Sequence, residues 1–167
     1  MPVQRLLAAL TRQSEIHEAL FELAGKKRMA LVRDDVNEVS ALSGKEAKLI
    51  RAIQECLSEQ SAATNEFFRD KGYQPTRAIN VTELSRMITD PALKAQLLSA
   101  RDKLASIVAK LKQANELNQQ LIEQSLAFIN YTIDLVVGPD DEPTYHNPAQ
   151  QRDKLGQHRA GYFDSRA

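Results

Sequence analysis

One stretch decides the fold of this chain: residues 90–139, with the sequence DPALKAQLLSARDKLASIVAKLKQANELNQQLIEQSLAFINYTIDLVVGP. Asp90 followed by Pro91 is typical of a helix start, because the carboxylate accepts unpaired N–H groups and proline has no N–H to leave unpaired. No further glycine or proline occurs before Gly138 and Pro139, which form a strong stop signal. The stretch therefore predicts a single helix of roughly 47 residues, about 70 Å long.

Apolar residues recur at seven-residue spacing along this predicted helix. They are Leu97, Leu104 and Leu111 in one series, and Val108, Ile122, Ile129 and Val136 in another. A seven-residue repeat keeps one stripe of the helix facing a partner helix. A helix this long and one-sided is not stable alone, so the rest of the chain must cover it.

The residues before this stretch predict two more long helices, near 3–32 and 35–70. Asp35 and Glu38 resemble a capping box, which indicates a new helix after a very tight turn. A link this short makes the two helices antiparallel neighbours. Beyond Gly72, which suits a helix end, the chain turns back through a short helical piece near 81–89.

The predicted fold class is all-α: an elongated antiparallel three-helix bundle or coiled coil with a short extra helix and a polar C-terminal tail. We expect one helical domain over residues 1–137 and a flexible tail over residues 138–167. The expected core of the bundle consists of Leu49, Ile53, Leu104, Val108 and Leu111.

Composition argues against several classes of function. Lys and Arg total 22, as do Asp and Glu, so no bulk field attracts nucleic acid or an anionic membrane. No apolar run approaches the roughly 20 residues of a membrane span. The single cysteine, Cys56, excludes an intramolecular disulfide and fits a reducing cytoplasm, where we expect it to be a small buried residue.

The sequence also lacks the motifs of an enzyme. It has no phosphate-binding loop, no nucleophile elbow, no Glu-x-x-His pair and no metal spacing among its three histidines. His17 lies on an apolar stripe, where a structural role is expected. Glu46 interrupts another stripe, where we expect it either to pair with a basic group across the helix interface or to mark the register of the helices. No enzyme activity, cofactor or metal is predicted.

The end of the long helix has more apolar surface than one helix seam requires. After Asn118 the stripe widens to roughly 140° on a helical wheel. Its two flanks are Leu121, Phe128 and Leu135 on one side, and Ile122, Ile129 and Val136 on the other. A three-helix bundle, in which each helix touches two others, is one explanation. Asn115 and Asn118 within the stripe fit either fixing of helix register or direct binding.

Helix lengths favour a second explanation. The long helix exceeds its neighbours, so antiparallel packing from a common end would leave roughly 16 Å without internal cover. That overhang would carry Phe128, Ile129, Leu135 and Val136, with Leu121 and Ile122 at the bundle edge. An uncovered apolar strip usually indicates a partner, and an amphipathic helix is the natural one.

The chain resembles the FlgN family of flagellar export chaperones over essentially its whole length. The resemblance rests on a leucine-spaced first helix and four motifs: Leu42–Leu49 (LSGKEAKL), Asn115–Ile122 (NELNQQLI), Thr144-Tyr145 and the ending Tyr162–Ala167 (YFDSRA). It implies a cytosolic, non-enzymatic chaperone for the hook–filament junction proteins FlgK and FlgL. Such a chaperone holds their C-terminal helices apart and delivers them to the flagellar type III export apparatus.

The resemblance also implies roles for particular residues. Family members bind their substrate through the C-terminal part of the helical region, which agrees with the uncovered strip. A tail tyrosine associated with docking to the export gate corresponds to Tyr145 here, followed by His146-Asn147-Pro148 where the family often has glycine.

A different class of function remains open on the residues alone. The wide apolar face could close a permanent homo-oligomer, which would make the protein a structural coiled-coil scaffold. A homodimer is also a candidate assembly for a chaperone. Measuring mass against concentration separates the two classes, because a scaffold exists only in its assembled form.

Overall fold

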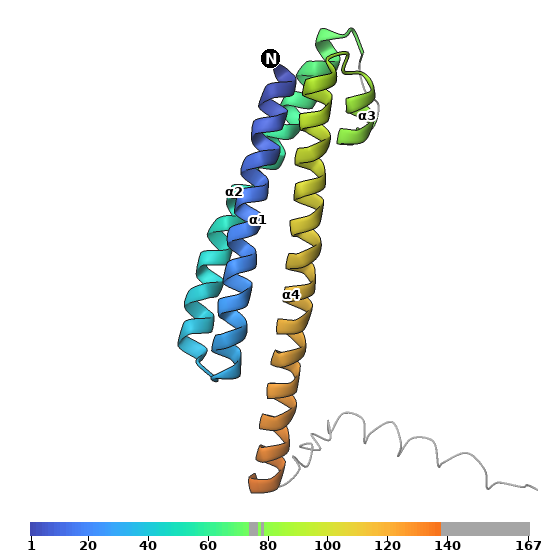
Figure 1. The fold of residues 1–167 in the computed structure, drawn as a ribbon. Helices are drawn as coiled ribbons and strands as arrows, with labels where there is room; N and C mark the ends of the chain where they lie inside the picture. Colours follow the sequence, from blue (N-terminus) through green and yellow to red (C-terminus); the bar gives the residue numbers. More distant parts are fainter. Residues whose placement is uncertain (74–76, 78, 138–167) are drawn as a thin grey trace, which may run out of the picture. The chain divides into compact units, whose positions relative to one another are not determined.

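The computed structural model describes residues 1–73, 77 and 79–137, which form four helices (Figure 1). They are α1 (Pro2–Val32), α2 (Val36–Asp70), α3 (Val81–Arg86) and α4 (Pro91–Val137). No strand occurs among these residues. The all-α prediction is confirmed, and the predicted helix boundaries lie within a few residues of the observed ones. The predicted tail, 138–167, lies outside the described residues.

The helix start signals predicted from the sequence form hydrogen bonds to backbone N–H groups in the structure. A carboxylate oxygen of Asp90 accepts the N–H of Ala92 at 2.9 Å, so Asp90 caps α4 as predicted. Asp35 caps α2 in the same way, accepting the N–H of Glu38 at 2.9 Å. The predicted capping box is only half formed, because the Glu38 carboxylate binds Arg33 at 2.7 Å instead of returning to the helix start.

Two turns use the left-handed backbone region. Gly72 has a φ of 76° just after α2, where the lack of a Cβ makes that conformation inexpensive. Asp34 has a φ of 55° in the turn between α1 and α2, which is uncommon for a residue with a side chain. A complete capping box that the sequence analysis missed, between Asn80 and Glu83, starts α3.

The chain divides into two compact units, residues 1–125 and the residues from 126 onward. In the first unit, α1 and α2 form an antiparallel hairpin and pack together most closely. The core gathers where the start of α1, the end of α2, α3 and the start of α4 meet. Its buried members are Val3, Leu6, Leu10, Ala63, Phe67, Phe68, Leu84 and Leu97.

The predicted core was wrong in its position along the helices. Leu49, Ile53, Leu104 and Leu111 are only partly buried, and Val108 is 41% exposed. The heptad repeat continues unchanged through these positions. However, four chain segments converge only at the observed core cluster around Leu97. Leu97, one heptad before Leu104, is fully buried there.

Several polar side chains of the first unit are buried or partly buried and have partners. Lys27 of α1 and Glu46 of α2 form an ion pair, which confirms the predicted pairing across the interface. The buried His17 donates from Nδ1 to the carbonyl oxygen of Gln13 at 2.7 Å, a structural role as predicted. Cys56 is buried, and this desolvation raises the pKa of its thiol.

Candidate protein-binding surface

The last turns of α4 carry an exposed apolar surface, formed by Leu126–Val137 of the second unit. Every side chain in this segment is exposed. Phe128 keeps 70% of its accessible surface, Ile129 50%, Leu135 67% and Val136 79%. These are the four residues that the sequence analysis expected to lack internal cover. Large apolar side chains exposed together mark a site for a partner.

The exposed surface is wider than the predicted two flanks. Leu126, Tyr131, Ile133 and Val137 are also exposed, and the sequence analysis did not include them. At about 100° per residue, the apolar side chains occupy roughly 240° of the helix circumference. This wider apolar surface could have been predicted from the sequence, because the segment LAFINYTIDLVV contains only one charge, Asp134.

The polar side chains of this segment leave the apolar ones free to bind. The Thr132 hydroxyl donates to the carbonyl oxygen of Phe128 at 2.9 Å, so it is satisfied within its own helix. Asn130 and Asp134 share the remaining polar arc with Ala127. A partner that approaches opposite this arc therefore meets apolar side chains and no charge.

The other predicted site residues lie elsewhere. Leu121 and Ile122 belong to the first unit and are partly buried. Ile122 lines a groove of about 410 Å³ in that unit. Tyr145 lies outside the described residues, so the predicted docking role is not tested by the structure.

This groove, which we call the α2–α4 groove, is formed by three helices of the first unit. Figure 1 shows α2 and α4 on either side of α1 along this part of the hairpin. The lining side chains are His17, Leu20 and Lys27 of α1, Glu46, Ile50 and Ile53 of α2, and Leu111, Asn115, Asn118, Gln119 and Ile122 of α4. Its walls combine apolar side chains with the amides of Asn115, Asn118 and Gln119, and its charged pair is the Lys27–Glu46 ion pair.

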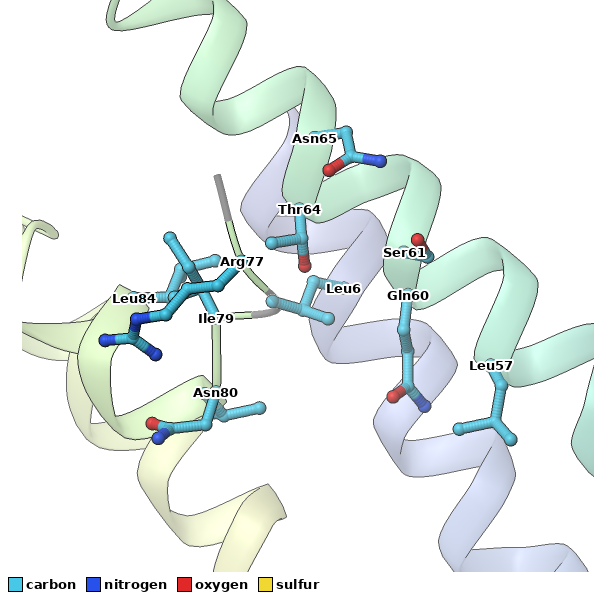
Figure 2. A pocket seen from close by; sticks show the side chains of 11 residues that line it. Leu6, Leu57, Gln60, Ser61, Thr64, Asn65, Arg77, Ile79, Asn80 and Leu84 are labelled. Atoms are coloured by element: carbon cyan, nitrogen blue, oxygen red, sulfur yellow. The ribbon is translucent and has the colours of Figure 1, made fainter. Parts of the chain in front are cut away.

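A separate pocket of about 390 Å³ lies between the α1–α2 hairpin and the segment leading into α3 (Figure 2). The α2 wall is uncharged and includes Gln60, Ser61 and Thr64, which are labelled in Figure 2. On the opposite side Arg77 donates two hydrogen bonds to Glu83, at 2.6 and 3.2 Å. The Arg77 guanidinium lowers the pKa of the Glu83 carboxyl, so this carboxyl suits an ion pair rather than proton transfer.

No helix among the residues that the structure describes is long and apolar enough to cross a membrane. No group of three or more His, Cys, Asp or Glu side chains among them is placed to hold a metal ion. The exposed apolar surface of Leu126–Val137 is suited to contact with another protein.

Comparison with known proteins agrees with that class. The FlgN protein family model matches residues 1–153, and the chain belongs to this family of flagellar export chaperones. The family resemblance read from the sequence is thereby confirmed. A Bacillus subtilis (strain 168) protein described as uncharacterized protein YvyG is 28% identical over 145 residues, covering 87% of each chain. No solved structure is a significant match.

Membership has two general consequences. FlgN proteins are chaperones and not enzymes, and their partners are flagellar hook-associated proteins. The exposed surface of Leu126–Val137 is thus found in a protein whose family binds other proteins.

Proposed function

We propose that this protein is the export chaperone of the hook–filament junction proteins FlgK and FlgL, and that it binds their C-terminal helical segments. The bound segment lies on the apolar surface of Leu126–Val137, with Phe128, Ile129, Leu135 and Val136 as anchors. Leu121 and Ile122 extend the contact. The observation that carries this proposal is the exposure of every apolar side chain in this segment.

The physical basis is burial of apolar area between two helices. Each Å² of apolar surface removed from water contributes about 25 cal/mol before the costs of association are subtracted. An amphipathic helix from the cargo gains the same contribution from its own apolar face. A cargo helix covered in this way cannot pack against its partners in the filament, which prevents premature assembly.

Delivery completes the proposed function. The chaperone acts in the cytoplasm and brings its cargo to the flagellar type III export apparatus. Tyr145, beyond the end of α4, docks at the export gate, as the family resemblance implies. This role keeps docking on the tail and cargo binding on α4.

The test replaces one anchor by a charge. Ile129→Asp should weaken binding of a purified C-terminal helical segment of FlgK by at least tenfold, about 1.4 kcal/mol, because the carboxylate must lose water on binding. Isothermal titration calorimetry measures the affinity, and thermal unfolding followed by circular dichroism should show little change, because Ile129 is half exposed before binding.

Ala127→Asp is the matched control. It adds the same charge on the polar arc beside Asp134, so binding should stay within about threefold. Unchanged affinity of the Ile129→Asp variant would show that cargo binds elsewhere. Unfolding by this substitution would place Ile129 in the core and contradict the proposal as well.

A further inference from the structure

The α2–α4 groove has the properties of an unoccupied helix site within the first unit. Its walls present Ile50 and Ile53 from α2, and Leu111 and Ile122 from α4. Ile50 keeps 50% of its surface exposed, so the apolar wall is open to a partner. Because three helices line the groove, a fourth helix placed in it would complete four-helix packing.

A buried polar atom beside the groove lacks a partner. Asn118 is 3% exposed, and its Nδ2 donates to the carbonyl oxygen of Ala24 at 2.9 Å. Its Oδ1 is buried and has no hydrogen-bond partner among the described residues. An unsatisfied buried acceptor destabilises the protein, because it has lost water without gaining a partner. A groove occupant that brings an N–H or O–H donor to Asn118 would remove this cost.

The chain carries one helical segment that matches these requirements, Leu126–Val137. On the α4 side the groove extends from Leu111 to Ile122, so groove and segment each span twelve residues, about 18 Å. The segment has a single charge, Asp134, and the groove neutralises its own pair of charges. The groove and the segment therefore match in length, and no unpaired charge of the groove opposes the segment.

The hydrogen-bond requirement is also met. Leu126, Asn130, Ile133 and Val137 follow at spacings of four, three and four residues, so they share one face of the helix. Among the described residues Asn130 has no hydrogen-bond partner, which leaves its amide N–H groups available. Asn130 thus places a donor at the edge of an apolar stripe, within reach of an acceptor such as the Asn118 Oδ1.

We propose that the α2–α4 groove is occupied by residues 126–137 of a second copy of this chain. The occupant comes from another copy because α4 is one continuous helix whose earlier turns form the groove wall, so its end cannot fold back into that wall. Reciprocal insertion gives a closed two-fold dimer, with two equivalent contacts.

The test measures the mass of the full chain without cargo, by sedimentation equilibrium between about 1 and 100 µM. A dimer is expected. Ile50→Glu in the groove and Ile133→Glu in the segment should each raise the dimer dissociation constant at least tenfold. Both positions are about half exposed, so folding should survive, as a circular dichroism melt will show. Val36→Glu, at an exposed site outside groove and segment, should leave the dimer unchanged.

Mixing the two variants gives the sharpest result. The Ile50→Glu protein keeps an intact segment and the Ile133→Glu protein an intact groove, so the mixture should form a heterodimer although each alone is monomeric. A monomeric wild-type protein at 100 µM, or a mixture that stays monomeric, would overturn the proposal.

Discussion

Lys27 of α1 and Glu46 of α2 form an ion pair in which each side chain keeps only 17% of its accessible surface. This pair lies in the interface between α1 and α2, away from the apolar core cluster. Glu46 occupies a position within an otherwise apolar stripe of α2. Each of these partly buried charges depends on the other for stabilisation. If one partner were removed, little water could reach the remaining charge to replace it.

The ion pair predicts unequal effects of single and double substitutions. Glu46→Leu should lower the free energy of unfolding by about 1.5–3 kcal/mol, because Lys27 loses its charged acceptor in a partly buried site. Lys27→Met combined with Glu46→Leu should recover most of that loss, since no charge remains to be desolvated. Urea denaturation measures both. Equal stability of the single and double variants would show that the pair is solvated.

The core cluster predicts where truncation is most damaging. Leu97→Ala should cost about 2–5 kcal/mol, because Leu97 is fully buried and its removal leaves a void. Leu117→Ala, on the same helix but 39% exposed, is the control and should cost less than about 1 kcal/mol. Similar losses for the two variants in chemical denaturation would contradict the observed position of the core.

The turn between α1 and α2 predicts a preference for glycine at position 34. Asp34→Gly should be neutral or stabilising by up to about 0.5 kcal/mol, since glycine adopts the φ of 55° without steric cost but is more disordered when unfolded. Asp34→Val should destabilise by about 1–2 kcal/mol, because a β-branched residue is strained there. Thermal melts compare the two. A more stable valine variant would refute the left-handed turn.

Burial of Cys56 predicts slow thiol chemistry. The folded protein should react with iodoacetamide at pH 8 at least tenfold more slowly than the urea-unfolded chain, because the buried thiol is shielded and its pKa is raised. Unfolding returns the thiol to its ordinary pKa near 9.0, so the unfolded state loses this proton first and stability should fall as pH rises through that value. Mass spectrometry follows alkylation, and Cys56→Ser removes the signal. Equal rates for folded and unfolded chains would place the thiol at the surface.

Tyr145 predicts a separation of cargo binding from delivery. Tyr145→Ala should bind the FlgK segment with unchanged affinity but fail to support secretion of FlgK into the culture medium. The reason is that Tyr145 lies beyond the α4 surface proposed to hold the cargo. Loss of binding by a variant that still folds would contradict this separation.

Local signals made most of the fold predictable. Asp90 and Pro91 start α4 because capping acts within a few residues. The depth of burial along α4 was not predictable in this way. Leu97 and Val108 both belong to the apolar pattern, yet one is fully buried and the other is 41% exposed. Which turns of the stripe are covered depends on where distant segments converge.

The candidate surface was predictable in part for the same reason. Phe128 and Ile129 were identified from helix spacing, and the structure shows them exposed. Tyr131 and Ile133 were missed, because a two-flank pattern was assumed where the apolar side chains surround most of the helix. The α2–α4 groove was not predictable, since its walls come from residues more than fifty positions apart.

Every member of the apolar core cluster lies between Val3 and Leu97, whereas the exposed apolar residues of Leu126–Val137 contribute nothing to it. Substitutions in residues 126–137 therefore escape the stability threshold that constrains a buried position. Descendants of this sequence can exchange Phe128 or Leu135 to follow changes in a partner without first acquiring compensating mutations. A family with this arrangement can acquire new binding specificities along its long helix while its hairpin changes slowly.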